Sequence, residues 1–477
     1  MGERCVIAID QGTTGTKVHR LGTDGTFETL GGFEHRQIFP RSGWVEHDPN
    51  ELIDHLTRCL ALGKDAAAIG LDNQGETVIA WDGKTKQPIY NAIVWQDART
   101  EDEIQRLKAT GAEAETLQRA GLPLDPYFSA SKLKWLLDNV PEAQELRRQG
   151  RLRLGTSDSF FLDRLGDRFI TDVTTASRTS LMNLETLNWD PVLCDLFGVP
   201  MDCLPQIGPT AGELGEIGDV PLAANVVDQQ AALFGHGCRK RGDAKITFGT
   251  GAFGLAIAGD RPLRDAASGL LPTVAWQIAG KPCAYALDGG VYNAASAINW
   301  ARGLGLFSDY AEIDRFAAEA AIVRSIVFVP ALSGLGCPYW DRSAAGMWLG
   351  LGLDTTKADL MQAVLEGIAL RASEVMRAMW TLTPVGDQLS IDGGVVQNDY
   401  FCRFLAAALD RRLMIPSSAE LTGLGAAQLA MIGAGLASQE TLPPAPPASR
   451  VVEPDQPLAV ELHERFGDAV KRCRAWR

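Results

Sequence analysis

Apolar runs that end in polar turns alternate along the chain with segments whose apolar residues recur every three or four positions. CVIAID at residues 5–10 and AAAIGLDN at 66–73 are typical of buried strands. KVHRLGTDGTFETL at 17–30 alternates as a hairpin does, with DG as its turn. ELIDHLTRCLALG at 51–63 and ASKLKWLLDNV at 130–140 have helical spacing. Strands that alternate with helices predict an α/β protein.

The second half of the chain repeats the pattern that opens the first. KITFGTGAFGLAIAG at 245–259 echoes residues 5–17, with a strand, a turn rich in Gly and Thr, and another strand. GCRKRGD at 237–243 separates the halves, so we expect domains over residues 1–240 and 241–477. Two long helices are predicted within 357–380 and 426–437, and the proline-rich tail at 443–457 is expected to be irregular.

Composition narrows the partners and the compartment. The 477 residues carry a formal net charge of -14, which argues against nucleic acid or an anionic membrane surface as a partner. No apolar run approaches the roughly 18–20 residues that span a bilayer, and MGERCVIAID lacks the layout of a secretory signal. We therefore expect a cytoplasmic protein. The nine cysteines form no CxxC pair, which favours buried thiols over a zinc site or a disulfide framework.

The turn after the first strand, DQGTTGTK at residues 10–17, has the chemistry of a phosphate-binding turn. Asp10 ends the strand and can hold a hydrated Mg²⁺, because hard cations prefer carboxylate oxygen. Glycines let the backbone approach a phosphate closely, and threonines offer hydroxyl and amide donors. A plain hairpin turn is the alternative. The residues concerned are Gly12, Thr13, Thr14, Gly15, Thr16 and Lys17.

Two further glycine-rich turns strengthen the phosphate interpretation. The second half has a similar turn with Thr247, Gly249, Thr250 and Gly251, and two such turns facing each other across a cleft would enclose a triphosphate. IDGGVVQN at 391–398 has a strand–GG–helix layout that suits a nucleotide. The chain has no GxxxxGK[ST] sequence, so it is not a P-loop protein.

Asp228, in VVDQQAALFG, lies at the end of a predicted strand or the start of a helix. A carboxylate close to a bound triphosphate can accept the proton of an attacking hydroxyl. The alternative is a helix N-cap, a common use of aspartate, and the two readings are compatible.

Many segments resemble, in the same order, the FGGY family of carbohydrate kinases, and within it most of all glycerol kinases. The resemblance runs from about residue 5 to about residue 436. It implies two ribonuclease-H-like domains of the actin/Hsp70/sugar kinase type with the active site in the cleft between them. The segments that carry it are AIDQGTTGTK, SGWVEHDPNEL, PIYNAIVWQDART, LDPYFSASKLKWLLDN, TDVTTASRTSLMNLETLNWD, DQQAALFG, FGTGAF, GLGCPYWD, GMWLGLGLDTTKADLMQAVLE and IDGGVVQN.

The same resemblance implies an ATP- and Mg²⁺-dependent kinase that phosphorylates a terminal hydroxyl of a small polyol, first of all glycerol to glycerol 3-phosphate. Asp228 would be the catalytic base, and Asp10 would position Mg²⁺. Polyol-pocket positions are matched by Glu76, Trp95, Tyr127, Asp228, Gln229 and Phe253. Phosphate- and nucleotide-contacting positions are matched by Thr13, Thr14, Gly15, Lys17, Thr250, Ala295, Asn299, Gly394 and Asn398.

The residue types suit a polyol, because carboxylates accept hydrogen bonds from hydroxyls while aromatic rings cover the carbon chain. Trp95 and Phe253 can equally be core aromatics, and we expect Trp135 to be one.

The chain departs from glycerol kinases at NQGE, where they typically read NQRE. Gly75 offers no side-chain donor, so we expect glycerol binding to weaken by ~1–3 kcal/mol unless another cation, such as Arg99 or Lys132, replaces the arginine. The vacated volume would admit a longer sugar alcohol such as erythritol. Ala295 and Asn299 replace the usual glycine and glutamine.

The stretch ELGEIGDVPLAANVVDQQ is shorter than its counterpart in bacterial glycerol kinases, so we predict no feedback by fructose bisphosphate.

Two other functions compete with that of a polyol kinase. A non-catalytic regulatory member of the family would be expected to have lost one of Asp10, Thr13, Thr250 or Asp228, and all are present. A chaperone ATPase or an actin-like filament would have no reason to keep the polyol-pocket residues. Family members often form dimers or tetramers, so a homodimer is expected.

Overall fold

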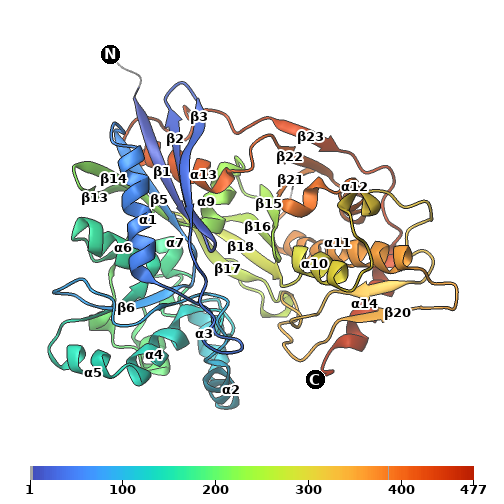
Figure 1. Cartoon of the computed structure of the whole chain (residues 1–477), viewed down its shortest axis with the longest axis horizontal. Coiled ribbons are helices and arrows are strands. Elements are labelled where there is room, and N and C mark those ends of the chain that lie inside the picture. Colours follow the sequence, from blue (N-terminus) through green and yellow to red (C-terminus); the bar gives the residue numbers. More distant parts are fainter. Residues whose placement is uncertain (1–3, 385) are drawn as a thin grey trace.

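Buried apolar runs form the strands of two large sheets, one in each lobe of the molecule (Figure 1). The structure, a computed structural model, describes residues 4–384 and 386–477. The first sheet has six strands: β13 (Ala211–Ile217), β14 (Val220–Val227), β5 (Ala68–Asn73), β1 (Cys5–Gln11), β2 (Gly15–Gly22) and β3 (Phe27–Glu34), in that order. The second has seven: β17 (Leu271–Trp276), β18 (Ala284–Val291), β16 (Ala252–Gly259), β15 (Ala244–Phe248), β21 (Gln388–Asp392), β22 (Arg412–Pro416) and β23 (Ala448–Val452).

The two sheets share one topology, as the repeated sequence pattern predicts. In the first, β1 is antiparallel to β2 and parallel to β5, which is parallel to β14. In the second, β15 is antiparallel to β16 and parallel to β21, which is parallel to β22. The carboxyl ends of β1, β5, β14 and β15 therefore lead into the segments that carry most of the candidate site residues.

Helices cover both faces of the first sheet. Helix α1 (Pro49–Leu62) and helix α6 (Ser157–Gly166) share an apolar cluster with Ile7, Ile9 and Leu71. On the opposite face lie α9 (Asp228–Gly235) and α13 (Leu421–Gly433). α13 comes from the end of the chain and packs against β1, β5 and β14. The proposed division at residues 240 and 241 is thus crossed by one helix.

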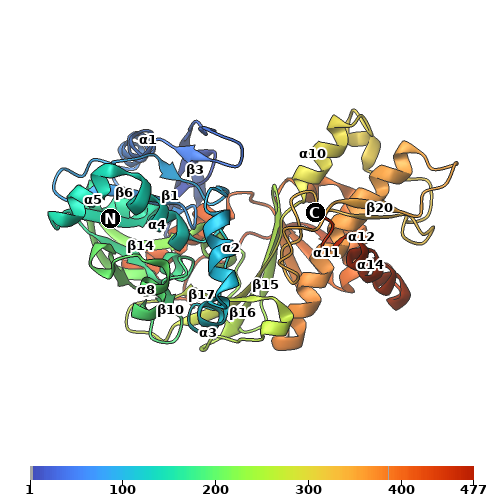
Figure 2. The same cartoon turned by 90° about the horizontal axis from the view of Figure 1, so that it is seen from below.

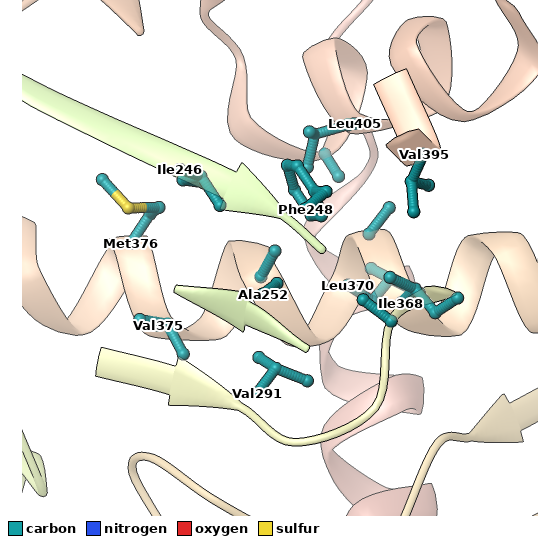
Figure 3. Close-up of a cluster of buried hydrophobic side chains, with 14 of the residues drawn as sticks. Ile246, Phe248, Ala252, Val291, Ile368, Leu370, Val375, Met376, Val395 and Leu405 are labelled. Carbon is teal, nitrogen blue, oxygen red and sulfur yellow. The ribbon is translucent and has the colours of Figure 1, made fainter. Parts of the chain in front are cut away.

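The core of the second lobe lies between its sheet and its helices. The strand residues Ile246, Phe248 and Val291 pack with Val375 and Met376 of the long helix α11 (Lys357–Leu382), as Figure 3 shows. The other helices of this lobe are α10 (Ala295–Gly303), α12 (Asp399–Leu409) and α14 (Val460–Cys473).

A smaller subdomain extends the first lobe (Figure 2). Its four strands are β4 (Glu46–His47), β7 (Ala92–Ile93), β6 (Val78–Asp82) and β8 (Leu152–Thr156). Its helices are α2 (Glu101–Ala109), α3 (Glu113–Arg119), α4 (Ser129–Asn139), α5 (Pro141–Arg148) and α8 (Pro191–Phe197). Short elements complete the chain: β9 (Ile170–Asp172), α7 (Val173–Ala176), β10 (Met182–Asn183), β11 (Asn188–Trp189), β12 (Gln206–Gly208), β19 (Val327–Val329) and β20 (Met347–Leu349).

The predicted strands and helices are present with shifts of a few residues at their ends. The tail is the exception, because residues 448–452 form the edge strand β23, antiparallel to β22. Prolines before and after this segment suggested irregular structure, but an edge strand tolerates proline at its ends. In the described part of the chain, no helix is long and apolar enough to cross a membrane.

Candidate active site

A cavity of about 180 Å³ lies where the two lobes meet, beyond the carboxyl ends of β5 and β14. Ligands of open α/β sheets bind at such strand ends. All six predicted polyol-pocket residues line it, namely Glu76, Trp95, Tyr127, Asp228, Gln229 and Phe253. They come from five separate segments of the sequence, so folding alone brings them together. The cavity is smaller than the roughly 300–1,000 Å³ of sites for drug-sized ligands.

Glu76 is held in place by strain and by an ion pair. It is 5% exposed and has a φ of 57°, in the left-handed region that a non-glycine residue rarely adopts. Backbone strain of this kind costs about 1–3 kcal/mol and concentrates at functional sites. Arg178 Nε donates to Glu76 Oε1 over 2.7 Å. Burial raises the pKa of Glu76, and the charge of Arg178 opposes that rise.

Aromatic rings form one side of the cavity. Trp95 and Tyr127 meet edge to face, with ring centroids 5.6 Å apart. Trp95 Nε1 donates to Thr13 Oγ1 over 3.1 Å, which ties this wall to the first glycine-rich turn. Trp95 and Phe253 line the cavity and are not core aromatics. Trp135 does not line the cavity and packs with Tyr90 and Trp44.

Asp228 is the first residue of α9, directly after β14. The N-cap of α9 is Val227, so the N-cap interpretation of Asp228 is wrong. Burial and then the charge of Glu76 raise the pKa of Asp228 to about 7, while a hydrogen bond from the Gln229 amide opposes the rise. A carboxyl group with this pKa is suited to take up a proton near neutral pH.

Asp10 lies at the end of β1 beside a second carboxyl group, Asp72 on β5. The two residues are directly paired in the parallel ladder. Asp72 is fully buried, and among the described residues its oxygens have no hydrogen-bond partner other than the neighbouring carboxyl group of Asp10. Burial raises the pKa of both, and the charge of Asp10 raises that of Asp72 further. Carboxylate oxygens without protein donors fit a hard cation such as Mg²⁺.

The two Gly- and Thr-rich turns leave their tips accessible. In the first, the Gly12 amide donates to the Gly15 carbonyl over 3.0 Å and Thr14 is exposed. Lys17 does not extend freely, because its Nζ lies 2.7 Å from Glu420 Oε1. In the second, exposed Thr250 accepts the amide of Ala294 over 2.9 Å, which sets the turn against the start of α10.

The remaining nucleotide candidates lie on the second lobe. Gly393 has a φ of 97°, and a Cβ there would lie 2.3 Å from the carbonyl oxygen of Phe248. Gly394 beside it is exposed, and Ala295 begins α10. Asn299 accepts a hydrogen bond from the Tyr310 hydroxyl over 3.1 Å. Asn398 caps α12 and donates to the Ile313 carbonyl over 2.8 Å, so its amide already has protein partners.

The family follows from matches over both halves of the chain. The model of the FGGY family N-terminal domain matches residues 5–235, and that of the C-terminal domain matches residues 244–434. The chain belongs to the FGGY family of carbohydrate kinases. It is therefore an ATP-dependent kinase with the two-domain ribonuclease-H-like fold that its sequence predicts.

Proteins similar to this chain include glycerol kinases. A glycerol kinase of Burkholderia ambifaria is 40% identical over 453 residues, which cover 91% of this chain and 90% of that protein. A glycerol kinase of Haloferax volcanii is 39% identical over 507 residues, which cover 100% of this chain and 99% of that protein. The crystal structure of Plasmodium falciparum glycerol kinase with ADP superposes with a TM-score of 0.89 at 28% identity, covering 99% of this chain and 98% of that one.

Neither of the two cations considered as replacements for the arginine forms an ion pair with Glu76. Arg99 pairs with Glu46 and Asp97. Lys132 Nζ donates to the carbonyls of Pro126 and Tyr127, at 2.8 and 2.6 Å. The cation that does pair with Glu76 is Arg178, which sequence reasoning missed.

Sequence reasoning also missed other residues in and near the cavity. Asp288 on β18 pairs with Arg178, and buried Lys245 donates to Gln229 Oε1 over 2.7 Å. Asp72 was overlooked although it stands at the end of a predicted strand, as Asp10 does. For Asp72 that position was an available signal, and for Arg178 the signal was its place in TDVTTASRTSLMNLETLNWD, one of the segments that carry the family resemblance.

Proposed function

We propose that this FGGY kinase phosphorylates a terminal hydroxyl of glycerol, giving glycerol 3-phosphate, with ATP and Mg²⁺. The observation that carries the proposal is a small cavity in which carboxyl groups and aromatic rings from both lobes converge. Hydroxyl groups would donate to Glu76 and Asp228, while Trp95 and Phe253 would cover the carbon chain. The similar glycerol kinases support the choice of glycerol.

The reaction would proceed by in-line transfer. Asp228 would accept the proton of the attacking hydroxyl while its oxygen bonds to the γ-phosphorus and the bond from phosphorus to the ADP oxygen breaks. The turns with Thr13 and Thr250 would hold the phosphates through their amide and hydroxyl donors. Asp10 would hold hydrated Mg²⁺, whose charge neutralises that of the phosphates. Positioning supplies much of the rate, and closure of the lobes would exclude water.

The second candidate acceptor is a longer sugar alcohol such as erythritol. The absence of a side chain at Gly75 suggested it, but Val227 occupies the place where that side chain would begin. A Cβ at position 75 would lie 2.7 Å from Val227 Cγ2. We therefore rank glycerol first.

A panel assay tests the proposal. ADP release is measured with Mg–ATP and glycerol, erythritol, threitol, ribitol, xylitol and the corresponding ketoses, with Asp228→Asn as the low-activity control. The highest kcat/KM is expected for glycerol. A preference for a four- or five-carbon alcohol would replace glycerol as the substrate, and absence of turnover with every acceptor would refute a polyol kinase.

Three expectations stay predictions. A homodimer and a cytoplasmic location follow from the family resemblance and from the composition. Insensitivity to fructose bisphosphate follows from the short connection between β13 and β14, which is a two-residue turn at 218–219.

A further inference from the structure

Arg178 bridges the two lobes inside the cavity. It follows the short helix α7, whose N-cap Asp172 accepts from the Thr174 and Thr175 amides. Its guanidinium pairs with Glu76 of the first lobe, and its Nη2 lies 3.0 Å from Asp288 Oδ2 on β18 of the second. Arg178 is only 5% exposed. A buried arginine held by two carboxylates has a fixed orientation, because the planar fork of donors matches their geometry.

One donor of Arg178 has no partner. Its Nη1 is buried and makes no hydrogen bond to any described residue, although Arg178 lines the cavity. Buried N–H groups are almost always paired, so an unpaired one beside a cavity indicates an acceptor that arrives with the ligand. A hydroxyl is well suited, because it can accept from Nη1 and donate to the neighbouring carboxylate.

Val227 explains why the arginine does not come from position 75. Its Cγ2 lies 2.7 Å from the place of a Cβ on Gly75, which is closer than real Cβ contacts. Val227 is 2% exposed and β-branched, so its side chain has few alternative rotamers. Both residues line the cavity. Gly75 and Val227 are therefore complementary in volume.

The charges around Arg178 also restrict the acceptor. Glu76, Asp228 and Asp288 all line the cavity, whereas Arg178 is the one cationic side chain among the described residues that line it. An acceptor with a carboxylate of its own would meet an excess of like charge. The cavity therefore favours a neutral polyhydroxy compound.

We propose that Arg178, oriented by Glu76 and Asp288, determines acceptor specificity by donating from Nη1 to a non-reacting hydroxyl of a neutral polyol, in place of a side chain at position 75. This inference rests on the polyol kinase function proposed above. It assigns Arg178 to substrate binding, Asp288 to positioning it, and Val227 to excluding a side chain at Gly75.

The test combines deletion of the arginine with deletion of its partner hydroxyl. Initial rates are measured at saturating Mg–ATP for wild type, Arg178→Lys and Arg178→Gln. The acceptors are glycerol and its two deoxy analogues, propane-1,2-diol and propane-1,3-diol. We expect a roughly 10- to 100-fold loss of kcat/KM for glycerol, mostly through KM, since hydrogen bonds to charged groups contribute on this scale. For the analogue that lacks the bound hydroxyl, the same variants should lose less than threefold.

Several outcomes would overturn the inference. An equal loss for glycerol and both analogues would mean that Arg178 acts only structurally, and no loss would mean that it does not bind the acceptor. Turnover of glycerate as fast as of glycerol would contradict the preference for a neutral acceptor. If wild type phosphorylates no polyol, the proposed function fails and this inference with it. If wild type phosphorylates glycerol but the Arg178 variants do not discriminate the analogues, only this inference fails and the proposed function stands.

Two further variants keep the test decisive if Arg178 substitutions prevent folding. Asp288→Asn retains the guanidinium but loosens it, and should raise the KM for glycerol severalfold while leaving the KM for ATP unchanged. An unchanged KM for glycerol would contradict the positioning role. Arg371→Lys is a matched control, because Arg371 is likewise buried but does not line the cavity and donates to the Cys337 carbonyl. It should lower Tm without changing the ratio of glycerol to analogue kcat/KM.

Position 75 gives an independent test. Gly75→Arg should lower Tm, because its Cβ meets Val227, and Val227→Gly in the same chain should restore it. In an Arg178→Gln background, this pair of substitutions should recover at least tenfold of the lost kcat/KM for glycerol. A Gly75→Arg protein as stable as wild type would contradict the exclusion by Val227. Absence of recovery in a folded triple variant would contradict the exchange of donors.

Discussion

The pH dependence of catalysis should reveal the coupling between Asp228 and Glu76. Burial and the charge of Glu76 raise the pKa of Asp228 to about 7 from an ordinary value of 3.8. A general base works only as the carboxylate, which would make up about one half of Asp228 at pH 7 and about one tenth at pH 6. We expect kcat/KM for the acceptor to fall about tenfold for each pH unit well below 7.

The fall of kcat/KM below pH 7 is the acid limb of the pH profile. Glu76→Gln should move this limb to lower pH. It removes the second cause of the raised pKa and leaves burial, the larger cause, in place. The pKa of Asp228 should therefore move toward 3.8 without reaching it. The ratio of kcat/KM at pH 6 to that at pH 8, about one tenth in wild type, should rise toward one. Because Glu76 also binds the acceptor, the whole profile should be lower, so the profiles are compared after normalisation.

The assay is ADP release from pH 5.5 to 8.5 at saturating Mg–ATP and low acceptor concentration. Asp228→Asn is the control, with a loss of about 10²- to 10⁴-fold and no acid limb. A limb that persists in Asp228→Asn would assign the titration to another group. A limb at the same pH in Glu76→Gln and wild type would refute the electrostatic coupling.

Three other substitutions test separate parts of the site. Asp72→Asn should raise Tm on the order of 2–4 °C at pH 8 in Mg²⁺-free buffer and change it little at pH 4, which thermal denaturation measures. The reason is that a carboxyl group whose pKa is raised by folding lowers stability above its unfolded pKa. Gly393→Ala should lower the free energy of unfolding by about 1–3 kcal/mol in urea titrations, since the φ of 97° and the Phe248 carbonyl leave no room for a Cβ. Asp10→Asn should raise the Mg²⁺ concentration for half-maximal rate by roughly 10- to 100-fold in a metal titration, and an unchanged value would remove Asp10 from the metal site.

The sequence predicts those parts of the site that follow directly from strands. Asp10, Glu76 and Asp228 stand just at or beyond the ends of apolar runs, and parallel strands bring such ends to one edge of a sheet. The convergence of the six predicted pocket residues on one cavity confirms their proximity, whereas their individual roles stay predictions.

The ion pairs of the cavity could not be predicted, because they join residues far apart in sequence. Glu76 and Arg178 are separated by 102 positions, and nothing in the sequence around Arg178 indicates which carboxylate it pairs with. The volume match between Gly75 and Val227 depends on the packing of β14 beside β5, which no local pattern specifies. The edge strand β23 was not predicted, because the prolines around it indicated irregular structure and its run of valines is short.

The return of α13 to the first sheet has a consequence for biosynthesis. Apolar residues of β1 and β14 are covered by this helix, and the main-chain oxygen of Ala426 lies so close to Gly70 that a Cβ there would be 2.5 Å from it. A ribosome adds roughly 200 residues between the end of α9 and the end of α13, which takes about 10–40 s at 5–20 residues per second. During that interval the nascent first lobe presents an uncovered apolar face, so completion of the N-terminal half waits for nearly the whole chain to be translated.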